Sequence, residues 1–145
     1  MPIEIITESL KLNIYGFPGI ASNGDHKGTA FKLMDKMWQV VKSNALSNKG
    51  KNIWIYEQAN AVFAGVELDS VPGTDIKLEH KSLVLEKYAY YKHIGPYHLI
   101  QQVGKFMNDE ISKKGFEVAL PYVEIYGHWS NDESKLETEL IMCLK

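Results

Sequence analysis

Two amphipathic segments with helical spacing, each set among strand-like segments, constrain what this chain can fold into. In both, apolar residues recur at intervals of three and four: Ala30, Met34, Met37, Trp38 and Val41 in the first, and Leu99, Val103, Phe106, Met107 and Ile111 in the second. Each helix therefore has one apolar stripe to bury against another element. We expect the first helix to end at Lys49-Gly50 and the second at Lys114-Gly115, because glycine adopts the left-handed conformation that ends many helices.

The rest of the chain has strand-like patterns. Runs of β-branched and aromatic residues, broken by turn residues, predict strands at about 3–8, 10–17, 52–57, 61–68, 76–80, 82–93, 121–127 and 136–144. Strands, a helix and a further pair of strands thus occur twice. The halves also match locally, since residues 52–56 resemble 122–126 and residues 66–68 resemble 138–140. We predict a single α+β domain over residues 1–145, with about eight antiparallel strands, two helices and an internal repeat of about 1–75 and 76–145.

Alternation along the strands divides their side chains into two sets that differ in kind. One set is almost entirely aliphatic: Ile53, Ile55, Val62, Ala64, Val66, Leu68, Val123, Ile125, Leu136, Thr138, Leu140 and Met142. The other mixes large apolar and aromatic side chains with isolated carboxylates: Trp54, Tyr56, Phe63, Glu67, Glu124, Tyr126, Glu139, Ile141 and Cys143. We expect the first set to face the helices and the second to line a groove.

A carboxylate held among aromatic rings attracts a delocalised organic cation by charge, and the ring faces add cation–π attraction. The second set of side chains therefore favours a site for a flat aromatic cation. The same rings are also compatible with a second apolar core or with a dimer surface, and Glu67 with a solvated strand residue.

The composition narrows the classes of function. The chain has 16 basic and 18 acidic residues, a formal charge of −2, which disfavours direct nucleic-acid binding. It has a single cysteine, no secretory signal and no apolar run long enough to cross a membrane, so we expect a cytoplasmic protein without a membrane partner. Histidine and cysteine lack the short spacings of metal ligands, and the motifs of serine hydrolases and phosphate loops are missing. We therefore predict no metal, no other cofactor and no catalytic residue.

Four segments resemble GyrI-like proteins and the effector-binding domains of multidrug-responsive transcription activators. The strand-to-helix signature of this family resembles residues 88–97, Tyr-Ala-Tyr-Tyr-Lys-His-Ile-Gly-Pro-Tyr. Its Phe-Glu-hydrophobic-Tyr strand is similar to residues 121–126, its closing Glu-containing strand to 137–141, and the end of its first half to 64–67. The resemblance covers nearly the whole chain. It implies two pseudo-symmetric β-α-β-β units joined in one curved antiparallel sheet, with both helices on one face and a ligand groove between the halves.

The resemblance also implies a site. In multidrug-responsive members the glutamate of the strand similar to residues 121–126 faces the bound cation, so Glu124 is the expected anchor and Glu139 the second acid. We assign the remaining ligand contacts to aromatic and histidine side chains: Trp54, Tyr56, Tyr126, Tyr91, His93, Tyr97 and Phe17. Activators of this family carry an N-terminal helix-turn-helix domain. Because the similarity here begins close to Met1, we expect a stand-alone member without a DNA-reading part, similar to gyrase-inhibitor-like or integron-cassette proteins.

The predicted function is binding of small aromatic, cationic, drug-like molecules, for sequestration or for signalling. Two alternatives remain open. In one, the chain acts on a protein partner such as DNA gyrase or a separate DNA-binding regulator. In the other, it hydrolyses a small molecule, with Glu124 or Glu139 acting together with a groove tyrosine.

Overall fold

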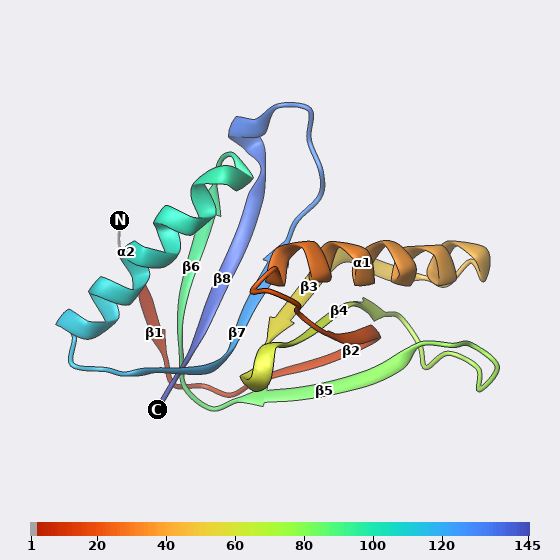
Figure 1. Cartoon of the computed structure of the whole chain (residues 1–145), viewed down its shortest axis with the longest axis horizontal. Helices are drawn as coiled ribbons and strands as arrows, with labels where there is room; N and C mark the ends of the chain where they lie inside the picture. The colour runs from red at the N-terminus through yellow and green to blue at the C-terminus, as the bar shows by residue number, and fades with distance from the viewer. Residues whose placement is uncertain (1–2) are drawn as a thin grey trace.

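The computed structural model describes residues 3–145, and in it all the strands belong to one curved antiparallel sheet with both helices on one face (Figure 1). The strands are β1 (Glu4–Ile6), β2 (Leu10–Ile20), β3 (Asn48–Tyr56), β4 (Ala61–Leu68), β5 (Glu79–Leu85), β6 (Tyr88–Ile94), β7 (Val118–Tyr126) and β8 (Glu137–Leu144). Their order across the sheet is β1-β6-β8-β7-β3-β4-β2-β5. The predicted α+β class and its eight-stranded sheet are confirmed.

The helices are α1 (His26–Ser43) and α2 (Ile100–Lys113), and each carries the apolar stripe that its spacing predicts. The carboxylate of Asp25 caps α1 by accepting a hydrogen bond from the backbone N–H of Gly28. After the C-terminal end of α2, Gly115 takes the predicted left-handed conformation, with a φ of 83°. Neither helix among the described residues is long and apolar enough to span a membrane.

The predicted end of the first helix is wrong. Helix α1 stops at Ser43, and Lys49-Gly50 lies inside β3, where a register shift between Asn48 and Asn52 accommodates the positive φ of Gly50. Ala45, with a φ of 50°, takes the place that Gly115 has after α2. The glycine that the sequence offers is therefore used for a β-bulge and not for a helix end.

The predicted boundary between strands 76–80 and 82–93 is also wrong. Residues 79–85 form β5, and the turn falls at Glu86-Lys87 before β6. His80 and Ser82 are polar and exposed because β5 is an edge strand that pairs only with β2. A polar edge strand resembles a turn in sequence, and for this reason the pattern predicts a boundary earlier than the observed turn.

The order β2-α1-β3-β4 recurs as β6-α2-β7-β8, and β3 and β7 pair in the middle of the sheet. In the register of the two hairpins, Tyr56 pairs with Val62 and Tyr126 pairs with Thr138. Thr138 therefore corresponds to Val62, and not to Val66 as the local sequence match suggests. The difference is an even number of residues, so it leaves the side chains on the same face.

The assignment of side chains to the two faces needs correction. Trp54, Tyr56 and Tyr126 share a core cluster with residues of α2 and with Leu140 and Met142, so they point to the helix side of the sheet. The opposite face is packed with aliphatic and aromatic residues: Leu12, Ile14, Ile53, Ile55, Phe63, Leu85, Tyr88, Val123 and Ile141. The predicted alternation of side chains between the two faces is correct within each strand. The relative phase of neighbouring strands depends on register, and grouping all the aliphatic residues placed β3 and β7 on the wrong side.

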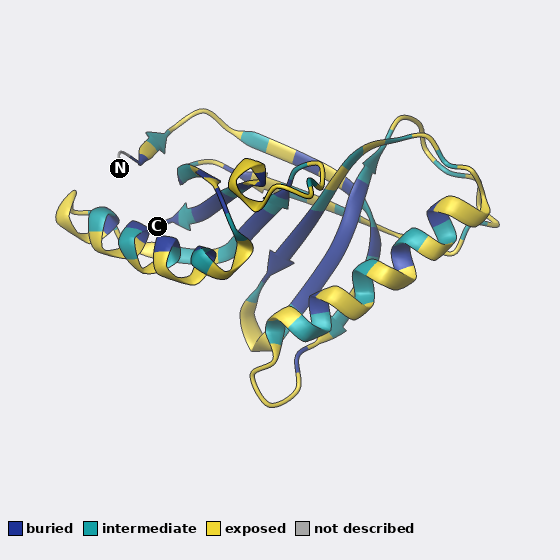
Figure 2. Ribbon diagram, turned by 90° about the horizontal axis from the view of Figure 1, so that it is seen from above, coloured by how far each residue is buried: buried dark blue, intermediate teal, exposed yellow. Residues whose placement is uncertain are grey.

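Both helices are buried along the side that contacts the sheet and exposed along the other, and the strands beneath them are largely buried (Figure 2). Helix α1 packs on β2 and β4 and helix α2 on β6, so the helices cover different parts of the same face. The central strands β3 and β7 lie between these two contacts. This arrangement leaves their aromatic and acidic side chains in the space between the helices.

Candidate ligand-binding site

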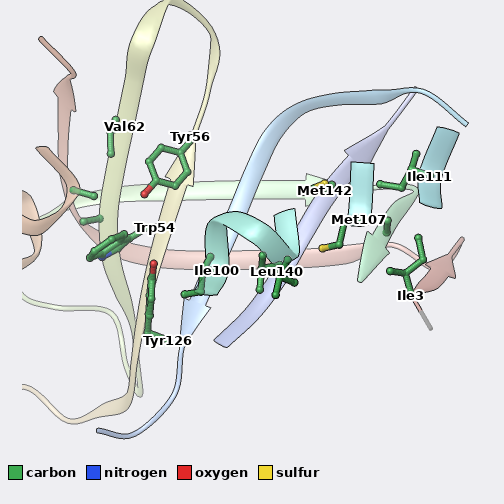
Figure 3. Close-up of a cluster of buried hydrophobic side chains, with 14 of the residues drawn as sticks. Ile3, Trp54, Tyr56, Val62, Ile100, Met107, Ile111, Tyr126, Leu140 and Met142 are labelled. Atoms are coloured by element: carbon green, nitrogen blue, oxygen red, sulfur yellow. The ribbon is translucent and has the colours of Figure 1, made fainter. Parts of the chain in front are cut away.

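The centre of the helix-facing side is formed by side chains of β3 and β7. In the pairing of these strands, Trp54 lies opposite Glu124, and Tyr56 lies opposite Tyr122. Because residues two apart along a strand point the same way, Tyr126 joins this group. The rings of Trp54, Tyr56 and Tyr126 lie close together in Figure 3. The centroids of Trp54 and Tyr126 are 4.6 Å apart, and those of Tyr56 and Tyr122 are 5.7 Å apart in a stacked pair.

Three tyrosines, which we call the tyrosine cage (Tyr56, Tyr122 and Tyr126), hold the carboxylate of Glu124. The Tyr122 hydroxyl donates to Oε2 at 2.6 Å, the Tyr126 hydroxyl donates to Oε1 at 2.7 Å, and the Tyr56 hydroxyl approaches Oε1 at 3.4 Å. Glu124 is only 1% exposed. A carboxylate can be buried in this way because phenolic donors replace the water that it loses.

The cage tyrosines are themselves perturbed by this arrangement. Burial, and then the negative charge of Glu124, raise the pKa of Tyr56, Tyr122 and Tyr126 well above the ordinary value of 10.0. Ionisation would place a phenolate beside a buried carboxylate, and it would remove the proton that makes the hydrogen bond. The three hydroxyl groups therefore remain donors across the physiological pH range.

A cation from α1 completes the surroundings of Glu124. The Nζ atom of Lys27 lies 3.7 Å from Oε2 of Glu124, and the Lys27 side chain is 56% exposed. The carboxylate thus has three phenols from the sheet and one ammonium group from α1 as its neighbours.

Two cavities adjoin this group, and Lys27 lines both of them. The larger one, which we call the aromatic chamber, has a volume of about 880 Å³ and is lined by Lys27, Gly28, Phe31, Met34, Gly50, Asn52, Trp54, Tyr97, His98, Tyr126, Gly127, His128 and Trp129. The smaller one, the second chamber, has a volume of about 540 Å³ and is lined by Lys27, Ile100, Gln101, Gly104, Lys105, Asn108, Val118, Ala119, Leu120, Tyr122, Glu124 and Met142. Both volumes fall in the range of small-molecule sites.

The structure brings five of the predicted ligand contacts together. Trp54, Tyr97 and Tyr126 line the aromatic chamber, and Glu124 lines the second chamber. Tyr56 contacts Glu124 as part of the tyrosine cage. The strand-to-helix junction places Tyr97 against Tyr126, edge to face with centroids 5.4 Å apart. Gly95, just before this junction, has a φ of 142°, which glycine tolerates best.

Three other predicted contacts lie elsewhere on the helix side. Tyr91 packs edge to face on Phe106 of α2, with centroids 6.4 Å apart. His93 is buried, and its Nε2 is 3.0 Å from the carbonyl oxygen of Pro96. Phe17 lies under α1, where the ammonium of Lys36 is 4.3 Å from the centre of its ring. None of the three is among the described residues that line the two chambers.

Glu139, the predicted second acid, points to the opposite face of the sheet. It pairs with Ile125 in β7 and with Lys92 in β6, and its carboxylate accepts a hydrogen bond of 2.6 Å from the Tyr90 hydroxyl. Glu139 and Glu67 line a separate cavity of about 170 Å³. Glu124 and Glu139, which the sequence pattern assigns to one groove, therefore lie on different sides of the sheet.

Several lining residues were not identified from the sequence. Tyr122 was recoverable, because it lies two residues before Glu124 in the same strand and so shares its face. Lys27, Phe31 and Trp129 carry no such signal, since a helix terminus, an exposed helix position and a loop bring them to the site only through the tertiary fold. In residues 3–145, no group of three or more His, Cys, Asp or Glu side chains is arranged to hold a metal ion.

Comparisons with known proteins agree with this architecture. No protein-family model matches the sequence, and no curated protein matches it. Solved structures do match over the full length. The C-terminal domain of EcmrR is 13% identical with a TM-score of 0.75, covering 100% of this chain and 99% of that one. SAV2435, solved bound to tetraphenylphosphonium, is 18% identical with a TM-score of 0.66, covering 100% of this chain and 94% of that one.

A third solved structure carries a different functional name. A protein from Listeria innocua that is named a hydrolase is 11% identical with a TM-score of 0.59, covering 99% of this chain and 91% of that one. At these identities the similarity establishes a common fold and leaves activity to be argued from the site. The chain therefore has the fold of the GyrI-like effector-binding domains, as the sequence resemblance predicts.

Proposed function

We propose that this chain binds small aromatic cations in the groove between α1 and α2, with Glu124 as the anchor for the positive charge. The observation that carries the proposal is a buried carboxylate, 1% exposed, held by the tyrosine cage beside a ring-lined cavity of about 880 Å³. Keeping a carboxylate buried costs free energy unless its charge is used or compensated. The phenols and Lys27 offset part of this cost, and a ligand cation adds to that compensation.

The aromatic chamber suits the rest of such a ligand. Trp54, Tyr97 and Tyr126 offer ring surface to a flat molecule, and each ring face over a cation contributes about 0.5 to 2 kcal/mol. Phe31 and Trp129, both largely exposed, border the same chamber and offer further ring surface at its rim. The similarity to SAV2435, which was solved with the aromatic cation tetraphenylphosphonium, supports this class of ligand.

We favour binding over hydrolysis because of the state of the Glu124 oxygens. A carboxylate has about four sites that accept hydrogen bonds. Three phenolic donors and the Lys27 ammonium surround Glu124, an arrangement that suits a fixed negative charge. A general base instead needs an oxygen directed at a water or a substrate proton. We therefore infer an effector-binding or sequestering protein, and the similarity to the EcmrR domain supports a link to transcription regulation.

The experiment that tests the proposal is a fluorescence titration with tetraphenylphosphonium and, as a neutral control of similar shape, triphenylphosphine oxide. Trp54 and Trp129 line the aromatic chamber and report occupancy. We expect saturable quenching by the cation with a Kd in the micromolar range, a binding free energy of about −8 kcal/mol, and much weaker binding of the neutral molecule. Equal affinities for both molecules, or no binding of the cation, would contradict the proposal.

A further inference from the structure

Lys27 has a position that the stability of its helix does not explain. It lies in the first turn of α1, directly after His26, and that turn contains no acidic residue. The N-terminus of a helix is the positive end of its dipole, so a negative charge is preferred there and a positive charge is unfavourable. The ammonium group is instead directed to the sheet, 3.7 Å from Oε2 of Glu124.

At this place Lys27 occupies the approach that a ligand cation needs. The phenols of the buried tyrosine cage contact both carboxylate oxygens from the sheet, and the largely exposed Lys27 approaches Oε2 from α1. A cation that approaches Oε2 of Glu124 from this side displaces the ammonium group. Since the Lys27 side chain is 56% exposed and has a flexible stem, it can leave and remain solvated. Displacement nevertheless costs the attraction between Lys27 and Glu124.

The charges around the groove are unequal. Glu124 is the only acidic residue among the described residues that line the two chambers, whereas Lys27 lines both chambers and Lys105 lines the second one. The second chamber also presents the amide side chains of Gln101 and Asn108. A simple monocation satisfies Glu124 but leaves two ammonium groups beside it. A ligand that also carries an anionic group gives those ammonium groups a partner.

We propose that Lys27 is an internal counter-ion that selects amphoteric aromatic ligands, meaning molecules with both a cationic ring system and an anionic group. The ring system lies in the aromatic chamber, and its positive charge is directed past Lys27 towards Glu124, which lines the adjoining second chamber. The anionic group lies in the second chamber, where it contacts Lys27 and Lys105. One internal ion pair is thereby exchanged for two pairs with the ligand. This inference rests on the proposed function and specifies the class of ligand.

Rhodamine B and its ethyl ester provide the test, because both are flat aromatic cations and only the first has a free carboxylate. Their affinities are measured by fluorescence anisotropy for the wild-type protein and for the variants Lys27→Met, Lys105→Met, Glu124→Gln and Lys32→Met. Lys32 is an exposed lysine of the same helix that is not among the described residues lining either chamber, so its loss controls for net charge.

We expect the wild-type protein to bind rhodamine B more tightly than the ester. In Lys27→Met, affinity for the ester should rise about fivefold, as expected for removal of a competing ion pair worth about 1 kcal/mol, and affinity for rhodamine B should fall. Lys32→Met should change neither affinity by more than about twofold. Lys105→Met should weaken rhodamine B and leave the ester unaffected.

Several outcomes would overturn the inference. If Lys27→Met changes the two affinities by the same factor, or if the ester binds the wild-type protein as tightly as the acid, Lys27 does not select for an anionic group. If both dyes bind and Glu124→Gln has no effect on either, the proposed cation anchor is wrong as well. If neither dye binds any variant but tetraphenylphosphonium binds, this inference fails and the proposed function stands; if tetraphenylphosphonium does not bind either, both fail.

Discussion

The hydrogen bond from the Tyr126 hydroxyl to Glu124 can be removed without disturbing the packing around it. Tyr126→Phe deletes one oxygen and keeps the ring against Trp54, at a centroid distance of 4.6 Å. The deleted bond is 2.7 Å long, both residues are buried and the acceptor is a carboxylate. A hydrogen bond to a charged group contributes about 1.5 to 3 kcal/mol, so we expect the free energy of unfolding to fall by about 2 kcal/mol.

A double-mutant cycle isolates the contribution of the charge. With glutamine at position 124 the acceptor is neutral, and a neutral hydrogen bond contributes about 1 kcal/mol. Tyr126→Phe should therefore cost about 1 kcal/mol less in the Glu124→Gln background than in the wild-type protein. Urea denaturation followed by circular dichroism gives all four free energies. For a chain of this size the single change should also lower Tm by about 5 °C.

An equal cost of Tyr126→Phe in both backgrounds would refute this reasoning. It would mean that the phenol does not stabilise a charged Glu124, and that the carboxylate is buried for another reason. Tyr90→Phe is the matched control, because Tyr90 donates to Glu139 on the opposite face. It should show no coupling to position 124.

Three further predictions concern pH, packing and the rim of the aromatic chamber. Burial and the charge of Glu124 raise the pKa of the three cage tyrosines in the folded state, so the unfolded chain loses its phenolic protons at lower pH than the folded chain. The free energy of unfolding should therefore fall above about pH 10, by up to about 1.4 kcal/mol per pH unit for each tyrosine. Urea midpoints at increasing pH test this, and an unchanged midpoint at about pH 11 would contradict it. Gly104→Ala adds a methyl group that meets only Met142, at 4.0 Å, so it should stabilise α2 by about 0.5 to 1 kcal/mol. The same methyl group should weaken ligands that enter the second chamber. Thermal unfolding measures the first effect and dye binding the second, and a lower Tm would contradict the space seen around Gly104. Trp129, which is 74% exposed, should contact ligand rings without selecting for charge. In titrations, Trp129→Ala should therefore weaken the binding of cationic and neutral aromatic ligands alike, by about threefold. Weaker binding of the cationic ligand alone would contradict this prediction.

The features predictable from the sequence are those that depend on local spacing. The apolar stripes of α1 and α2 are set by intervals of three and four residues, and Gly95 and Gly115 stand where the backbone needs a positive φ. The repeated order of elements predicts a duplicated unit, and the resemblance to effector-binding domains implies that the two units join in one curved sheet. The resemblance to effector-binding domains adds the placement of both helices on one face.

The features that were not predictable depend on register and on distant contacts. Alternation places Trp54 with Tyr56 and Glu124 with Tyr126, but it cannot say which face of β4 or β8 these residues share. For that reason the sequence pattern predicts Glu139 beside Glu124, although the pairing of Ile125 with Glu139 turns it to the other side. Lys27 reaches Glu124 from a helix far away in sequence, a contact that only the packing of α1 on the sheet creates.

The most direct test of the account compares tetraphenylphosphonium binding by Glu124→Gln and Glu139→Gln. Both changes remove one carboxylate that accepts a tyrosine hydroxyl, but only Glu124 lines the groove between the helices. We predict that Glu124→Gln lowers the affinity at least about tenfold, or about 1.4 kcal/mol, and that Glu139→Gln leaves it within about twofold. Equal effects of the two changes, or a larger effect of Glu139→Gln, would contradict Glu124 as the cation anchor.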